Sequence, residues 1–330
     1  MKSSEKTTWK PIIGLPDNAN TWGLPEYANL VSEWHQLVKE ITDKNHDKTN
    51  LNIWLRERRR AFAIETGQIE GLYTLKRGIT EQLITEGLSS AVSSHTEEGI
   101  DDKIIKGLLT DQQTALEAIF SEIKDRRPLS HFTLKSWHQL LTRHQETVTG
   151  LRPQGDRMVK VQVEFKRKGE YKLHPNNPRR PDGTIHEYCP PEHVQSEMDR
   201  FFDLYDNIRR QNLPTEVEAA WLHHRFVAIH PFQDGNGRVS RLLMAHVYSR
   251  KNELPPVIST ENKAIYIDAL ENADRGDLRA FSDLLGGLAS VQTRSAVRAA
   301  KNILEGKHSY SHANGAITSN GIYYPPENAQ

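Results

Sequence analysis

A twelve-residue stretch, His230-Pro-Phe-Gln-Asp-Gly-Asn-Gly-Arg-Val-Ser-Arg241, gathers a base, a carboxylate, two glycines and two arginines. His230 carries an imidazole that can accept a proton from an attacking hydroxyl group. Asp234 is a hard oxygen ligand, suited to a Mg²⁺ ion that is shared with phosphate groups. These residue types at this spacing predict chemistry on a nucleotide polyphosphate with a bound metal ion.

The second half of the stretch is suited to holding the phosphates. Gly235 and Gly237 allow a tight turn that brings backbone N–H groups close to an anion. A helix predicted to begin there would turn its positive end toward the same anion. Arg238 and Arg241 share a face of that helix and can reach one ligand together. The alternative is a glycine-rich loop that only caps a helix, which would need neither the histidine nor the aspartate.

The stretch resembles the active-site motif of the Fic family, His-Pro-Phe-x-[Asp/Glu]-Gly-Asn-Gly-Arg-x-x-Arg, at every fixed position. The resemblance implies a protein adenylyltransferase, which transfers AMP from ATP to a Ser, Thr or Tyr hydroxyl of a target protein. It implies that His230 is the general base, that Asp234 binds Mg²⁺ and that ATP is the co-substrate. Phosphate contacts are implied for Gly235, Asn236, Gly237, Arg238 and Arg241.

Two alternative functions remain open at this stage. One is transfer of another nucleotide or of a phosphate-containing group, and the other is a catalytically silent Fic binding module. Family members that act as kinases replace the second glycine of the loop with lysine, so Gly237 argues against that reaction. The intact His230 and Asp234 argue against a silent site.

Upstream, Thr66-Gly-Gln-Ile-Glu70-Gly71 resembles the inhibitory motif of the same family, [Ser/Thr]-x-x-x-Glu-[Gly/Asn]. Thr66 and Glu70 lie four residues apart and would share one face of a helix. The resemblance implies that Glu70 pairs with Arg241 in the place of the γ-phosphate, so that ATP binds only unproductively. Some members with this arrangement also remove AMP, and that activity stays open here. The alternative is an exposed helical glutamate.

Two further segments resemble binding elements of the family. Tyr266 and Asp274 lie in a segment similar to the helix that borders the adenine pocket, although Asp274 stands where many members have asparagine. An amphipathic core helix is the alternative for this segment. Residues 150–190 lie where the family has a β-hairpin flap that presents a backbone edge to the target protein. The flap residues expected to contact the target are Tyr171, Lys172, Leu173 and His174, and an ordinary surface loop is the alternative.

The local pattern within 150–190 supports extended structure. Met158–Phe165 alternates between apolar and polar residues, which predicts a strand or hairpin. Gly169–Asn176 is predicted as a second extended piece, and Pro-Asp-Gly at 181–183 as a turn.

Helical periodicity dominates elsewhere and must position the motif. Apolar spacing predicts helices around 116–123 and 194–205. Further helices are predicted at about 216–228, 237–251, 262–275 and 277–304, the first of which delivers His230 at its C-terminal end. Thr215 and Glu218 form a capping-box signature for that helix. The expected fold is mainly α, with a Fic-type helical core, a β-hairpin flap and an N-terminal helical region. The predicted boundaries are a leader and helix at 1–49, a helical region with the inhibitory motif at 50–125, the Fic core at 126–290 and a helix end with a flexible tail at 291–330.

Composition limits the remaining classes of function. The 330 residues suffice for one large or two ordinary domains, and 43 Lys and Arg balance 43 Asp and Glu. This balance gives no support to a nucleic-acid or membrane-surface role. Cys189 is the single cysteine, which excludes an intrachain disulfide and fits a reducing, cytoplasmic setting. The polar N-terminus predicts no signal peptide or membrane span. The expected partners are ATP and a target protein, and a homodimer is left open.

Overall fold

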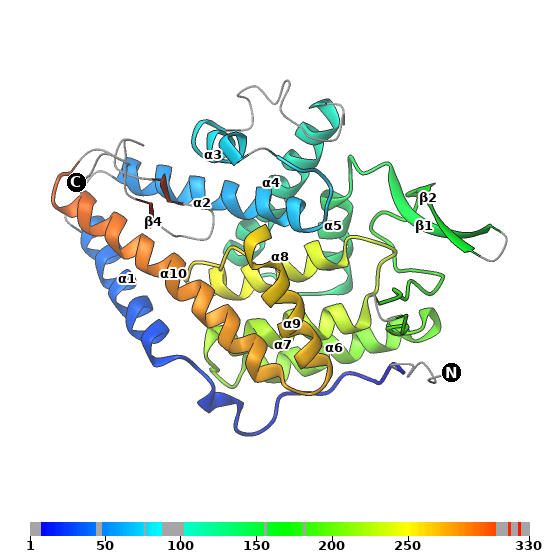
Figure 1. The fold of residues 1–330 in the computed structure, drawn as a ribbon. Coiled ribbons are helices and arrows are strands. Elements are labelled where there is room, and N and C mark those ends of the chain that lie inside the picture. The colour runs from blue at the N-terminus through cyan, green and yellow to red at the C-terminus, as the bar shows by residue number, and fades with distance from the viewer. Residues whose placement is uncertain are drawn as a thin grey trace.

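The computed structural model describes residues 8–43, 48–75, 77–87, 102–154, 157–180, 183–307, 316–317 and 323–324. The fold is mainly α, as the sequence predicts, and helices make up most of the described residues (Figure 1). The α-helices are α1 (Pro25–Asp43), α2 (Lys48–Ile69), α3 (Arg77–Glu86), α4 (Asp102–Lys124), α5 (His131–Leu141), α6 (Val194–Arg209), α7 (Thr215–Ile229), α8 (Asn236–Arg250), α9 (Lys263–Asp274) and α10 (Leu278–Leu304). Three short 3-10 helices are η1 (Ala19–Thr21), η2 (Pro191–His193) and η3 (Thr260–Asn262).

Helices α7 and α8 form the centre of the molecule. Both are buried on nearly all sides, including Trp221 and Phe226 on α7 and Leu243 and Tyr248 on α8. A helix that is buried on all sides is enclosed by other elements, and here the enclosure comes from α2, α4, α5, α6, α9 and α10. One apolar cluster runs from Ile12 in the leader to Ala289 on α10, so parts of the predicted segments 1–49, 50–125 and 126–290 pack together.

Two smaller apolar clusters fix the position of α2, which leads to the inhibitory motif. Trp34 on α1 and Trp54 on α2 pack with Ala300 on α10 in the first of these clusters. In the second, the fully buried Ile64 on α2 packs with apolar residues of α3 and α4. Because both flanks of α2 are packed, its C-terminal end is held against the core.

The helices predicted around the motif are present as α7, α8, α9 and α10, with ends shifted by at most two residues. The predicted capping box is wrong. Pro214 occupies the N-cap without a side-chain bond, and Thr215 Oγ1 donates a hydrogen bond to Glu253 at 2.8 Å. The buried Glu218 carboxylate binds the cationic side chains of Arg250 and Lys251, because they compensate a buried charge better than a backbone N–H does.

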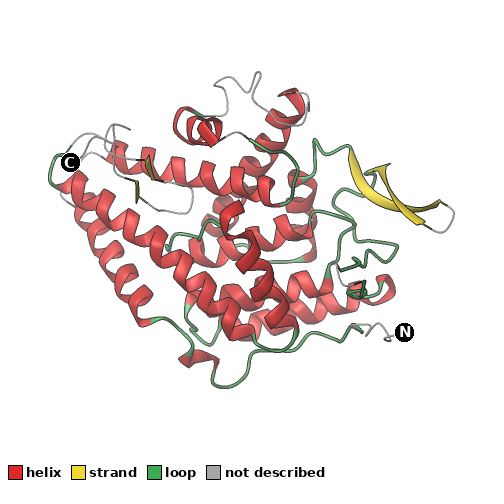
Figure 2. Ribbon diagram, in the orientation of Figure 1, coloured by secondary structure: helices red, strands yellow, loops and turns green. Residues whose placement is uncertain are grey.

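A two-stranded antiparallel hairpin projects from the helical body (Figure 2). Strands β1 (Thr147–Gln154) and β2 (Arg157–Glu164) pair with Val148 opposite Val163. The strand predicted near 158–165 is therefore β2, and its partner is β1, whereas the extended piece predicted at 169–176 forms no named strand. That later segment is irregular, with one isolated bridge between Tyr171 and Phe232, and prolines at 175 and 178 remove ladder donors.

The predicted turn at 181–183 lies partly outside the described residues. Its flanks meet, because Arg179 pairs with Ile185 and the Arg180 N–H donates to the Thr184 carbonyl at 2.8 Å. The predicted flexible tail also lies mostly outside them, apart from the pairing of β3 (Ala316–Ile317) with β4 (Tyr323–Tyr324). Among the helices of the described ranges, none combines the length and apolar character needed to cross a membrane.

Candidate active site

His230 sits immediately after α7 in the left-handed conformation, with φ 51° and ψ 57°. A non-glycine residue in this region costs about 1 kcal/mol, and such strain often accompanies a functional position. The imidazole Nδ1 lies 3.2 Å from the carbonyl oxygen of Val227, which accepts a hydrogen bond only from a protonated Nδ1. Burial, followed by the positive charge of Lys172, lowers the pKa of His230 to about 3. The ring is therefore neutral near pH 7, with Nε2 able to accept a proton.

The loop after His230 is closed by Asn236. Its Oδ1 accepts from the Phe232 N–H at 2.9 Å, and its Nδ2 donates to the Phe232 carbonyl at 2.9 Å. Gly235 supports this turn in the left-handed region, with φ 79°. Both ends of the amide bond the backbone of Phe232, and a phosphate contact of the Asn236 side chain stays a prediction. The start of α8 still offers its unpaired N–H groups to an anion.

Arg238 is engaged with protein groups. Its side chain is fully buried and donates from Nη1 to the Leu141 carbonyl at 3.1 Å and from Nη2 to Gln145 Oε1 at 2.6 Å. The carbonyl groups in the last turn of α5 need donors, and Arg238 supplies one. Arg238 therefore supports the loop from inside, and phosphate binding stays a prediction for both Arg238 and Arg241.

Asp234 has the properties of a metal ligand. Gln145 Nε2 donates to its Oδ2 at 2.7 Å and the Gly235 N–H donates to its Oδ1 at 2.7 Å. Burial raises its pKa, but the charge of Arg238 and these two hydrogen bonds outweigh burial, so the net pKa is lowered. The carboxylate is thus ionised and lines the main cavity. No cluster of three or more acidic, histidine or cysteine ligands occurs among the described residues. One carboxylate fits a Mg²⁺ ion that takes its other ligands from water and nucleotide phosphates.

Glu70 lies just beyond the end of α2 and reaches the motif. Its Oε1 accepts a hydrogen bond from Arg241 Nη2 at 2.5 Å, and the Thr66 carbonyl accepts another from the same nitrogen at 3.3 Å. Gly71 ends the helix in the left-handed region, with φ 69°. Gly237 is required for the approach, because a Cβ there would collide with the Glu70 carboxylate. The ion pair implied for Glu70 is present, and Thr66 contributes its backbone rather than its hydroxyl.

Tyr266 and Asp274 do not line the main cavity. The Tyr266 hydroxyl lies 2.9 Å from His223 Nε2 and accepts a long hydrogen bond from Arg241 at 3.5 Å. Asp274 Oδ1 lies 3.0 Å from His224 Nε2. Each side chain is therefore engaged with protein groups, and a role in adenine binding stays a prediction for both.

The flap expectation needs correction at its first two residues. Tyr171 pairs with Phe232, and the Lys172 N–H donates to the Pro231 carbonyl at 2.8 Å. The motif itself thus occupies this backbone edge at Tyr171 and Lys172. Leu173 is 59% exposed and lines the main cavity together with His174, so target contact stays a prediction for these two residues.

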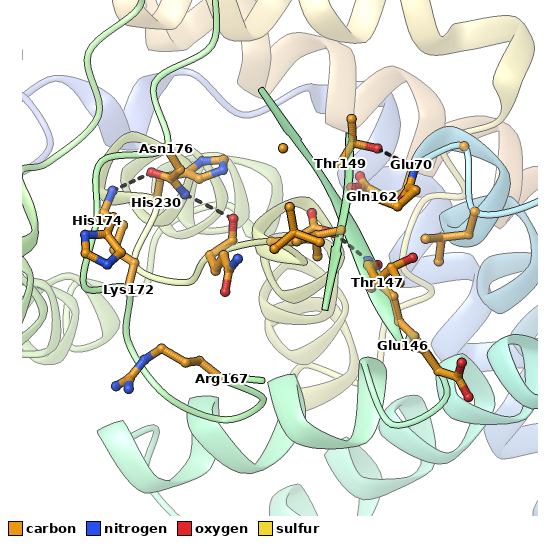
Figure 3. A pocket seen from close by; sticks show the side chains of 18 of the residues that line it. Glu70, Glu146, Thr147, Thr149, Gln162, Arg167, Lys172, His174, Asn176 and His230 are labelled. Carbon is orange, nitrogen blue, oxygen red and sulfur yellow. Dashed lines mark hydrogen bonds between the residues drawn. The ribbon is translucent and has the colours of Figure 1, made fainter. Parts of the chain in front are cut away.

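The main cavity has a volume of about 1000 Å³ and brings together segments far apart in the sequence (Figure 3). One side holds Lys172, Asn176 and His230, and the other holds Glu70 with Thr147 and neighbouring hairpin residues. A neutral imidazole and the carboxylates of Asp234 and Glu70 therefore line one space.

Three residues of the site were not found by sequence reasoning. Gln145 bonds Asp234 and Arg238, Tyr188 stacks on His230 at 3.7 Å, and His138 stacks on Phe232 at 3.8 Å. All three reach the motif only through tertiary packing, so no local pattern pointed to them. The only sequence signal for these three residues was that they lie among other polar and aromatic residues, a pattern that is common on protein surfaces.

Comparison with known proteins agrees with this geometry. Residues 128–248 match the model of the Fic/DOC family. The segment also matches Protein adenylyltransferase fic-1 of Caenorhabditis elegans at 34% identity over 91 residues, which is 28% of this chain and 18% of that protein. A second match is Protein adenylyltransferase Fic of Aedes aegypti, at 46% identity over 63 residues, or 19% of this chain and 13% of that one. Residues 128–248 of this chain are therefore similar to the Fic/DOC family.

The fold comparison extends beyond the domain. A solved Fic domain containing signaling protein from Bacteroides thetaiotaomicron superposes with a TM-score of 0.67 at 24% identity, covering 84% of this chain and 97% of that chain. Fic-1 from C. elegans superposes with a TM-score of 0.58 at 20% identity, covering 84% and 73%. These similarities concern the fold. Because the sequence matches span less than a quarter of each curated relative, they do not carry over the activity of the whole protein.

Proposed function

We propose that this chain is a protein adenylyltransferase that moves AMP from ATP to a hydroxyl side chain of another protein and is restrained by Glu70. The observation that carries the proposal is the neutral His230 imidazole, whose Nδ1 is tied to Val227 beside the cavity that holds Asp234. The names of the sequence relatives support the same activity.

In this proposal, the target oxygen attacks the α-phosphorus of ATP while its proton passes to Nε2 of His230. The bond from the α-phosphorus to the bridging oxygen breaks, and pyrophosphate leaves. The N-terminus of α8 and Arg241 bind the phosphates and align them for in-line transfer. A Mg²⁺ ion held by Asp234 would neutralise negative charge on those phosphates.

Restraint follows from competition for Arg241. While Glu70 holds this guanidinium at 2.5 Å, the γ-phosphate lacks its cation and the nucleotide lacks its productive alignment. The carboxylate is 22% exposed and the guanidinium 2% exposed, so solvent screens the pair only weakly. Release of Glu70 is therefore the step that activates the enzyme.

The proposed setting is the cytoplasm, on the basis of the single cysteine, which is buried. The proposed partners are ATP and a protein segment that meets Leu173 and His174 at the mouth of the cavity. A homodimer remains compatible with the proposal.

The test is AMP incorporation from labelled ATP by wild type, Glu70→Gly, Glu70→Gly/Arg241→Ala and Glu70→Gly/His230→Ala. If the restrained state is favoured by about 3 kcal/mol, Glu70→Gly raises incorporation roughly 100-fold. Arg241→Ala should abolish the gain, and His230→Ala should lower the rate by about 100-fold or more while nucleotide binding persists. Mass spectrometry of the chain itself and of lysate proteins identifies the modified residues. Equal rates for wild type and Glu70→Gly, or full activity without His230, would reject the proposal.

A further inference from the structure

Lys172 is a buried lysine on the wall of the main cavity, with 3% of its surface exposed. Its Nζ donates to Asn176 Oδ1 at 2.8 Å, and this amide oxygen is neutral. Within the described residues, Lys172 forms no salt bridge with a carboxylate. The ammonium therefore lacks a counter-charge in a place where water supplies little solvation.

An unpaired buried charge destabilises a fold. A chain that keeps one in a cavity therefore points to a use for that charge. Burial lowers the pKa of Lys172 to about 8, so the side chain is still mainly charged at pH 7. Asn176 keeps the ammonium in place, because its Nδ2 donates to the Phe232 carbonyl of the motif at 2.8 Å. The arrangement is a fixed cation that faces a cavity without its anion.

The ammonium also lies close to His230. Tyr188 stacks on the His230 ring with centroids 3.7 Å apart, and Lys172 Nζ is 5.8 Å from the centroid of the same Tyr188 ring. The positive charge of Lys172 helps to lower the pKa of His230. Figure 3 shows Lys172, Asn176 and His230 grouped on one side of the cavity. An anion that pairs with the Lys172 ammonium would therefore bind close to His230, the residue that receives the proton.

We propose that Lys172 is a further catalytic residue, whose ammonium binds a non-bridging oxygen of the phosphate group that is transferred. This inference rests on the proposed function and adds a cation on the side of the cavity opposite Glu70. The new bond joins the target oxygen to the α-phosphorus, the bond to pyrophosphate breaks, and the target proton goes to His230. Lys172 remains protonated throughout and stabilises the charge that builds on the equatorial oxygens.

The position of Lys172 on the chain supports this role. Its N–H is bonded to the Pro231 carbonyl, immediately after His230, so the backbone fixes the lysine to the motif. A cation held this way needs no rearrangement when charge develops in the transition state. Arg241 is a separate cation, because its guanidinium lies beside Glu70, Thr66 and Tyr266 on the inhibitory side.

The experiment uses the full chain with Glu70→Gly, in which transfer is released. Lys172→Gln and Lys172→Arg are compared with Lys166→Gln, a matched control whose exposed ammonium pairs with Glu164. Measured quantities are the rate of AMP incorporation at saturating ATP, the dissociation constant of a non-hydrolysable ATP analogue, the unfolding temperature and the pH profile of the rate.

Lys172→Gln should lower the rate about 100-fold with less than a threefold change in binding of the ATP analogue. Lys172→Arg should recover a tenth or more of the rate, and Lys166→Gln should match its parent. Loss of the nearby charge should also move the acid limb of the pH profile upward, because the pKa of His230 rises. If Lys172 served only in packing, its loss would not shift the acid limb of the pH profile, and Lys172→Arg would not recover the rate.

A Lys172→Gln rate within threefold of its parent overturns the inference. So does an equal loss in Lys172→Gln and Lys172→Arg with an unshifted pH profile, since that outcome indicates packing. Failure of the proposed function is distinguishable, because the Glu70→Gly parent would then incorporate no AMP although the ATP analogue binds.

Discussion

At the scale of single residues, Gln145 gives one neutral amide to two charged partners. It donates to Asp234 at 2.7 Å and accepts from Arg238 at 2.6 Å. Groups that orient a metal ligand commonly change metal affinity by 10- to 100-fold. Gln145 therefore helps to orient the Asp234 carboxylate, as the Gly235 N–H of the motif does.

Replacement by a similar side chain without hydrogen bonds tests this role. In the Glu70→Gly background, Gln145→Leu should weaken Mn²⁺ binding in the presence of ATP about tenfold, measured by the electron paramagnetic resonance signal of free Mn²⁺. Gln162→Leu is the control, because Gln162 borders the same cavity but bonds Thr149 on the hairpin. Equal Mn²⁺ affinity in all three proteins would remove Gln145 from the site.

The residue scale also shows how far the sequence carries. The types and spacing of His230, Asp234 and Glu70 predict a site at which the structure brings them together. Spacing on a helix places Arg238 and Arg241 on one face, yet it does not say which side chain is drawn inward by a free carbonyl such as that of Leu141. Contacts of this kind depend on the neighbouring helix, which the local sequence does not describe.

At the scale of elements, the end of α2 holds the inhibitory carboxylate. Gly71 adopts φ 69° there, and a Cβ at this position would meet no atom within 4 Å. A substitution therefore adds backbone strain without a steric clash. The strain is about 1–2 kcal/mol, and it is relieved if the last turn of the helix opens and Glu70 leaves Arg241.

Gly71→Ala should accordingly raise AMP incorporation by up to about tenfold over wild type, less than Glu70→Gly does. Gly306→Ala is the matched control, because Gly306 follows α10 with φ 67° and equally open surroundings. It should lower the unfolding temperature by a similar amount and leave the rate unchanged. Activation by both variants would attribute the effect to general loosening.

Elements differ in how well the sequence predicts them. Helices α7 to α10 lie close to the predicted ranges, since signals such as Pro214 before α7 and the prolines at 255 and 256 after α8 are local in the sequence. The identity of the strand that pairs with β2 does not follow from local sequence, because pairing depends on which segment of the chain lies beside β2. The two-residue separation of β1 from β2 favoured a hairpin, whereas the prolines at 175 and 178 opposed the predicted alternative.

At the scale of the whole molecule, buried histidines make stability depend on pH. Burial is the leading cause that lowers the pKa of His138 to about 3, of His246 to about 4 and of His223 well below its ordinary value. The unfolded chain takes up these protons near pH 6.5, before the folded chain does. Each such histidine therefore contributes stability that is complete above pH 6.5 and falls by about 1.4 kcal/mol per pH unit below it.

The unfolding temperature, followed by circular dichroism, should consequently drop steeply between pH 6.5 and pH 4.5. His246→Leu should flatten the drop, because His246 packs against Trp137 and lies outside the active site. His35→Gln, at an exposed position on α1, should leave the slope as it is. An unfolding temperature that stays constant from pH 7 to pH 5 would contradict this account.

The close approach of Glu70 to Gly237 couples the evolution of two positions that lie far apart in the sequence. A lineage that keeps the glutamate must keep glycine at position 237, since even one methyl group would displace the carboxylate from Arg241. A lineage that loses the glutamate is freed from that particular constraint. Drift at position 237 is therefore permitted only after restraint has been given up, and the order of the two substitutions in a family tree would record when a descendant became constantly active.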